Sequence, residues 1–169
     1  MQDFLNTTDI ESETDLVDTP SALAEWLGTK GLAGWDAKVS GVEHARVIEL
    51  RERLRDALEA VTHGADPSAA YERLDEIAAE VPLRVTFGGA ARLESAGPGS
   101  SPALGPILAT VYDALASDAL GRLKVCRNEA CRWAFYDTSR NRSGVWCSMA
   151  ICGNRQKGRV YRSRHAADR

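Results

Sequence analysis

The amino-acid sequence predicts an α+β protein, with a mostly helical N-terminal domain that includes a small β-hairpin, followed by a small cysteine-rich module. Three observations support this prediction. Apolar residues recur at helical spacing through most of the first two thirds of the chain, a short alternating stretch follows Pro82, and all four cysteines lie between residues 126 and 152. A length of 169 residues accommodates one ordinary domain and a small added module. We therefore expect domains at residues 1–121 and 122–169.

The helices are predicted from apolar residues three and four positions apart, which is the spacing of one helix face. Pro20 and Pro67 each follow a capping side chain, so each indicates the first turn of a helix. A longer helix is expected over residues 42–61, and another over residues 104–115. Pro82 should end the helix that begins near Pro67, because proline cannot continue a helix.

The hairpin is predicted from a change of period. Residues 83–87 alternate between apolar and polar, glycines occupy positions 88 and 89, and the alternation resumes over residues 91–93. Two alternating runs separated by a glycine-containing turn are typical of a short β-hairpin. The Gly-, Ser- and Pro-rich residues 97–102 should form a linker before the last helix of the N-terminal domain.

Charge is divided unevenly along the chain, although the net charge is only −3. Residues 1–121 hold 9 Lys and Arg against 21 Asp and Glu, a net of −12, and residues 122–169 hold 12 against 3, a net of +9. A basic segment attached to an acidic body is typical of proteins whose basic part faces nucleic acid.

The four cysteines form two pairs, Cys126–Cys131 and Cys147–Cys152, with four residues inside each pair and fifteen between the pairs. Such spacing favours one zinc ion held by four thiolates, with the middle segment forming a hairpin that returns the chain to the metal. Three alternatives stay open: free or disulfide-bonded cysteines, an iron–sulfur cluster, and His165 as a replacement ligand.

Several classes of protein are not expected. The N-terminal residues lack the basic and apolar regions of a signal peptide, and no apolar stretch is long enough to span a membrane, so a cytoplasmic location is expected. The N-terminal domain has no glycine-rich phosphate loop and no convincing pair of nucleophile and base. We therefore expect no enzymatic activity.

The residues around the cysteines add a family resemblance. Residues 126–143 and 146–155 closely resemble the CGNR zinc finger family, and Asp3-Phe-Leu-Asn-Thr7 resembles the opening motif of the ABATE domain that precedes this finger in bacterial proteins. The resemblance implies a stress-induced transcription regulator. The chain departs from the family at Gly144-Val145, where two arginines are usual, and this departure puts a phosphate contact there in doubt.

A helix is expected directly after Cys152, and with the knuckle and hairpin it would complete a treble-clef-like finger. Arg155, Arg159 and Arg162 would share one face of this helix and contact DNA, while Val160 and Tyr161 pack on the hairpin. Auxiliary phosphate contacts are expected from four further basic residues: Arg140, Arg142, Lys157 and Arg164. Asn154 and Arg155 follow the last cysteine and should orient the thiolates and the turn around the metal.

The leading functional prediction is therefore a zinc-containing DNA-binding protein that regulates transcription. Two alternatives remain: a structural zinc module that binds another protein, and an RNA-binding protein. Asp3 and Asn6 would either line a small-molecule effector pocket or attach the N-terminal segment to the body by hydrogen bonds.

Overall fold

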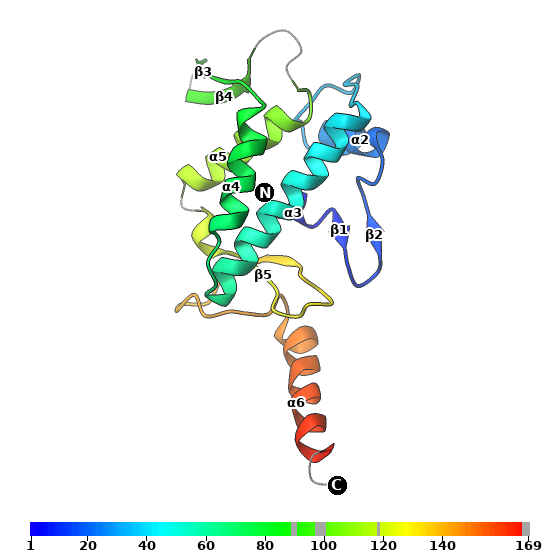
Figure 1. Ribbon diagram of the computed structural model, residues 1–169, viewed down its shortest axis with the longest axis vertical. Helices are drawn as coiled ribbons and strands as arrows, with labels where there is room; N and C mark the ends of the chain where they lie inside the picture. The colour runs from blue at the N-terminus through cyan, green and yellow to red at the C-terminus, as the bar shows by residue number, and fades with distance from the viewer. Residues whose placement is uncertain (89–90, 97–100, 118, 167–169) are drawn as a thin grey trace.

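The computed structural model describes residues 1–88, 91–96, 101–117 and 119–166, and within them it has an α+β fold with a mostly helical N-terminal region (Figure 1). The predicted fold class is therefore confirmed. The elements, in chain order, are α1 (Gln2–Leu5), β1 (Thr8–Asp9), β2 (Thr14–Asp15), α2 (Pro20–Thr29), α3 (Gly41–His63), α4 (Ser68–Ala79), β3 (Leu83–Phe87), β4 (Ala91–Ser95), α5 (Leu104–Ala116), η1 (Ala119–Arg122), β5 (Leu123–Val125), β6 (Ala134–Tyr136), η2 (Met149–Gly153) and α6 (Asn154–Ala166).

Local capping explains where the longer helices begin and end. The Thr19 side chain accepts a hydrogen bond from the Ala22 backbone N–H (3.1 Å) at the start of α2, and Ser40 accepts one from Glu43 (3.1 Å) at the start of α3. Gly64 ends α3 in the left-handed conformation, with φ of 74°. The helices expected from the sequence are thus present within a few residues of their predicted bounds.

The predicted hairpin is β3 paired with β4, antiparallel, with Val85 opposite Leu93. Residues 89–90, at the expected turn, and residues 97–100, in the expected linker, lie outside the described residues. The hairpin predicted between the two cysteine pairs is wrong. That segment contributes only β6, and the partner of β6 is β5, which precedes Cys126. β1 and β2, two residues each, were not expected because so short a run carries no alternation.

α3 is the central helix, and the core forms around it. Val47, Leu50 and Leu54 lie on its inward face at intervals of three and four, and each is at least 95% buried. The same cluster includes residues of α1, α2, α4 and α5, and it continues into Leu123 of β5 and Ala134 of β6. Because the finger's hairpin shares the core of the N-terminal region, the finger is an integral part of the folded body.

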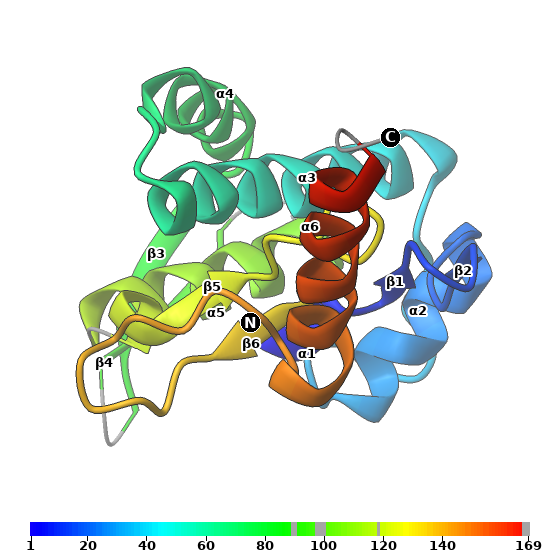
Figure 2. The same cartoon turned by 90° about the horizontal axis from the view of Figure 1, so that it is seen from below.

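α6 projects away from this body (Figure 1), and Figure 2, seen from below, shows it on the near side of the molecule, in front of part of α3. Its root packs against η2, while its remaining turns are exposed. No helix in the described parts of the chain has the length and apolar character required to cross a membrane.

Candidate metal centre

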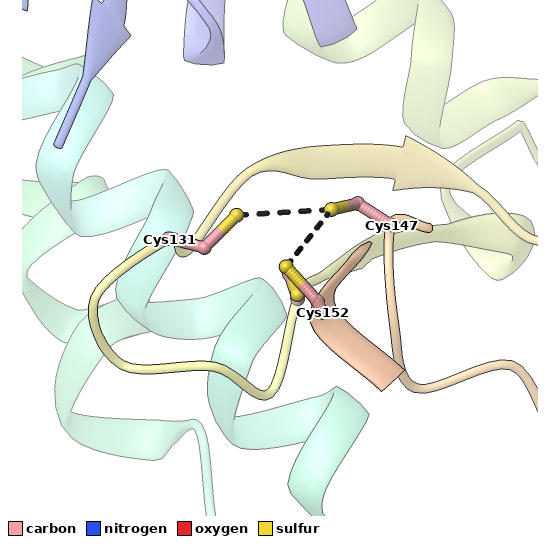
Figure 3. A group of neighbouring side chains, drawn as sticks. Cys131, Cys147 and Cys152 are labelled. Atoms are coloured by element: carbon pink, nitrogen blue, oxygen red, sulfur yellow. Dashed lines mark hydrogen bonds between the residues drawn. The ribbon is translucent and has the colours of Figure 1, made fainter. Parts of the chain in front are cut away.

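Four thiol groups meet between the β5–β6 hairpin and the root of α6. Cys126 directly follows β5, Cys131 ends the turn before β6, Cys147 precedes η2, and Cys152 lies within η2. Their sulfur atoms all lie within 4.8 Å of one another, and the Cys131–Cys147 and Cys147–Cys152 separations are both 3.7 Å (Figure 3). Four sulfurs around a tetrahedral zinc ion, each at about 2.3 Å, lie about 3.8 Å apart. The cluster therefore has the dimensions of a four-thiolate zinc site.

Backbone hydrogen bonds shape the turn that carries the first pair. The Asn128 carbonyl accepts from the backbone N–H of Cys131 (2.7 Å) and of Arg132 (2.9 Å), and Cys126 donates to the Trp133 carbonyl (2.9 Å). Arg132 adopts the left-handed conformation with φ of 47°, which turns the chain back into β6. The second pair is placed by Ser148, whose hydroxyl caps η2 by accepting from Ile151 N–H (3.3 Å).

The thiols of Cys126, Cys131 and Cys147 differ in pKa. All four are free, so none forms a disulfide. A hydrogen bond with Cys131 lowers the pKa of Cys126 to about 5, and the same contact raises the pKa of Cys131. Burial raises the pKa of Cys147 to about 12. Among these three thiols, a thiolate is favoured at Cys126, and negative charge is disfavoured at Cys131 and Cys147. A bound dication would supply the missing countercharge and displace the remaining protons.

The Asn128 side chain donates a hydrogen bond to a cysteine of the cluster, and the sequence did not single it out. Its side chain is buried and donates from Nδ2 to Cys152 Sγ (3.7 Å), while its Oδ1 accepts from Arg159 Nη1 (3.4 Å). Asn154, which was expected to orient the thiolates, instead donates to the Ala150 carbonyl (3.1 Å), and Arg155 pairs with Glu11 (2.6 Å). Asn128 therefore links the metal centre to α6.

A second polar cluster shapes the loop between β6 and Cys147. Asp137 is buried and accepts from Lys124 Nζ (2.7 Å) and from the backbone N–H groups of Ser139 (2.9 Å) and Gly144 (2.7 Å). The hydrogen bond from Lys124 is the largest influence that holds the pKa of the Asp137 carboxyl well below its usual range. A Cβ atom at position 144 would lie 2.8 Å from Asp137 Oδ1. Glycine at this position thus permits the close approach of Asp137.

The N-terminal motif binds directly to the finger. The Asn6 side-chain amide donates to the Ala134 carbonyl (2.9 Å) and accepts from the Ala134 N–H (2.8 Å), and Gln2 also donates to the same carbonyl (3.2 Å). Of the two roles considered for Asn6, the structure therefore shows attachment. Asp3 pairs with Lys30 (2.5 Å) at the rim of a cavity of about 180 Å³, below the range typical of ligand sites.

One arginine of α3 and one of the finger complete this contact. Arg55 is fully buried and donates to the carbonyls of Arg132 (2.7 Å) and Leu5, which joins α3, α1 and the knuckle. Arg132 in turn pairs with Asp56 (2.8 Å) and Glu59 (2.6 Å) of α3. No motif marked these residues. The position of Arg55 on the inward face of a predicted helix was the only indication of its role in the sequence. The partners of both arginines are distant in sequence.

The predicted DNA-contact residues fall into three groups. Arg155 and Arg159 of α6 have partners within the chain, Glu11 and Asn128. Four others are exposed and have no partner among the described residues: Arg140, Lys157, Arg162 and Arg164. Arg142 is exposed in a left-handed turn with φ of 49° and does have a further contact.

The apolar residues of α6 are placed differently from the prediction. Val160 and Tyr161 do not pack on the hairpin, because α6 projects from the body and leaves them 37% and 63% exposed. The Tyr161 ring lies 4.2 Å from the ring of His165, and His165 is not part of the cysteine cluster. His165 is therefore no metal ligand in this structure.

Comparison with known protein families matches two consecutive regions. Residues 1–120 match the ABATE domain, described as "Putative stress-induced transcription regulator", and residues 122–165 match the CGNR zinc finger. The four-cysteine cluster lies within the second region, so the family and the geometry together give one zinc site per chain. Neither family is described as enzymatic. A search of curated proteins found no match.

Proposed function

The chain belongs to the ABATE family, whose description is "Putative stress-induced transcription regulator", and carries a CGNR zinc finger, and on this basis we propose that it binds DNA through the finger and α6. Zinc would be held by Cys126, Cys131, Cys147 and Cys152, with no coordination position left for a substrate. Its role is structural: it holds the root of α6 against the knuckle.

The observation that carries the proposal is the projecting basic helix. α6 stands clear of the acidic body, and no Asp or Glu occurs between residues 138 and 166. An α-helix fits the major groove of DNA, and the basic side chains of a segment without carboxylates would supply the phosphate contacts that make binding strong at low salt.

The contacts of the basic residues suggest separate roles. Lys157, Arg162 and Arg164 of α6 have no partner in the described chain, so they are available to phosphates. We assign the main phosphate contacts to these three, with Arg140 and Arg142 of the preceding loop as auxiliary contacts. Arg155 and Arg159 would contact DNA from the helix root while they also attach α6 to Glu11 and Asn128.

A titration of the zinc-loaded chain against a random DNA duplex at several salt concentrations tests the proposal. We expect binding whose logarithm falls linearly with the logarithm of salt concentration, with a slope of about −4 for four or five phosphate contacts. Matched single-stranded RNA distinguishes the RNA alternative, since tighter RNA binding at equal salt would replace DNA as the ligand. An absence of binding to either nucleic acid at low salt would leave protein binding as the function of the finger.

A further inference from the structure

An open groove of about 510 Å³ runs along the joint between η2 and α6. Trp146, Met149, Val160 and Tyr161 form its apolar floor. The polar residues along it are basic or neutral: Gln156, Lys157, Arg164 and His165. No cysteine of the metal centre lines the groove. The proposed DNA contact shares Lys157 and Arg164 with the groove but does not use its apolar floor.

The groove has the shape of a docking surface for a chain segment. Its α6 residues, at positions 156, 157, 160, 161, 164 and 165, are three and four apart, so they form one stripe along the 13-residue helix, which is about 20 Å long. Met149 is 54% exposed and Tyr161 is 63% exposed, so nothing in the described chain covers the stripe. A small molecule would remain largely in water on so open a surface, whereas a helix laid along the groove would cover it.

The charge of the groove indicates the chemistry of the segment that would bind in it. The groove is rimmed by Lys157 and Arg164 in a segment without carboxylates, so its partner should carry acidic side chains beside apolar ones. The aliphatic Met149 and Val160 on the floor favour protein side chains over nucleic-acid bases, which stack on aromatic rings. The chain's own acidic body lies on the far side of the helix root, because α6 projects away from it (Figures 1 and 2).

A matching surface is present on α4. Leu74 and Ile77 face inward, while Tyr71 is 48% exposed, and Glu72 and Asp75 are exposed without any partner in the described residues. At 12 residues, α4 is about 18 Å long, which is close to the length of the groove. It is therefore an acidic helix with an exposed aromatic side chain and the length that the groove requires.

We propose that the groove between η2 and α6 is the docking site for α4 of a second copy of this chain. Each copy offers both surfaces, so two copies could use them reciprocally and close a two-fold dimer. The pairing Arg155–Glu11 (2.6 Å) shows that acidic and basic parts of the chain already pair at the root of α6. In the dimer the same complementarity would act between molecules.

Sedimentation velocity of the full-length, zinc-loaded and nucleic-acid-free protein tests this inference. We expect dimers at micromolar concentration in 50 mM salt, with a dissociation constant that rises at least about tenfold in 500 mM salt because screening weakens the charge pairs. The variant Lys157→Glu/Arg164→Glu makes the groove acidic, and Glu72→Lys/Asp75→Lys makes α4 basic. Each variant alone should be monomeric, since both its surfaces then carry charge of the same sign.

A mixture of the two variants provides the decisive measurement. Both contacts in the mixed pair again join opposite charges, so the mixture should dimerise about as strongly as the unmodified chain. Lys38→Glu/Arg92→Glu reverses two exposed charges away from both surfaces and should leave dimerisation unchanged. Circular dichroism and zinc content establish that each variant is folded.

Four results would overturn the proposal. These are a monomer at 100 µM in low salt, undiminished dimers in the groove variant, a mixture that stays monomeric, and association that requires added DNA. The last result would assign the groove to nucleic acid.

Discussion

Asn6 and Ala134 lie 128 residues apart and exchange two hydrogen bonds, from Asn6 Nδ2 to the Ala134 carbonyl (2.9 Å) and from the Ala134 N–H to Asn6 Oδ1 (2.8 Å). The side-chain amide takes the place that a neighbouring strand would occupy beside β6. Since Ala134 is fully buried, neither of its backbone groups can bond to water instead. The N-terminal motif is thus part of the finger's hydrogen-bonding structure.

Replacing Asn6 by Ala should therefore destabilise the whole chain. The Ala134 carbonyl keeps the bond from Gln2, but its N–H loses the only partner shown, at a cost of about 1–3 kcal/mol in the free energy of unfolding. Urea unfolding of zinc-loaded protein measures this change. Thr8→Ala is the matched control, because it removes only a long bond (3.4 Å) at an exposed site. Equal stability of the two variants would contradict the role assigned to Asn6.

Removal of a zinc ligand should unfold more than the finger. Purified protein should contain about one zinc per chain, and Cys131→Ser or Cys147→Ser should lose it. Because Leu123 and Ala134 belong to the common core, the thermal midpoint of the remaining helices should fall as well. Metal analysis and circular dichroism measure the two effects. A full equivalent of zinc in both variants would refute the ligand assignment.

Asn128→Ala should weaken zinc binding without removing it. Partners of metal ligands typically contribute about 10–100-fold in affinity, and the Asn128 amide is the group that reaches Cys152 Sγ. Competition with a chromogenic chelator gives the dissociation constant. Asn154→Ala is the control, since its amide bonds the Ala150 carbonyl and should leave zinc affinity unchanged. Similar affinities for both variants would show that the contact with Cys152 is unimportant.

Asp137 should make stability depend on pH. Lys124 holds its pKa in the folded chain below the unfolded value of about 4. The carboxylate therefore stabilises the fold at pH above about 4, and this contribution is lost as pH falls through the lower, folded pKa. Asp137→Asn should be less stable than the unmodified protein at pH 7 and pH 5, and the difference should shrink below pH 4. Urea titrations measure the difference, with the exposed Asp18→Asn as control. A difference that stays constant down to pH 3 would contradict the prediction.

Arg162→Ala/Arg164→Ala should weaken DNA binding similarly for all sequences. Because the variant lacks two of the cations that neutralise phosphates, the slope of log affinity against log salt should flatten by about one to two units. Fluorescence anisotropy with random duplex measures the slope, and zinc content verifies the fold. Arg84→Ala/Arg92→Ala removes the same charge from the β3–β4 hairpin and should leave the slope unchanged. An unaltered slope in the α6 variant would move the DNA contact away from α6.

Much of this protein could be predicted from local patterns. The helices of residues 20–29 and 41–63 follow from apolar spacing and capping side chains, which act within a few residues. The cysteine pairs were recognisable because each knuckle places two ligands within one short turn, and thiolates have a strong preference for zinc. Counting the charged residues was sufficient to show that the N-terminal region is acidic and the C-terminal segment is basic.

Only the tertiary structure decided how these parts meet. Asn6, Arg55 and Asn128 carry no local signal for their roles, since each bonds to a group between 24 and 128 residues away. The sequence also placed Val160 and Tyr161 against a hairpin, whereas α6 leaves the body and exposes them. A periodic pattern shows which side chains share a helix face. Whether that face points toward the core or toward solvent depends on hydrogen bonds between buried polar groups and on contacts between apolar surfaces. Segments distant in the sequence determine both kinds of contact.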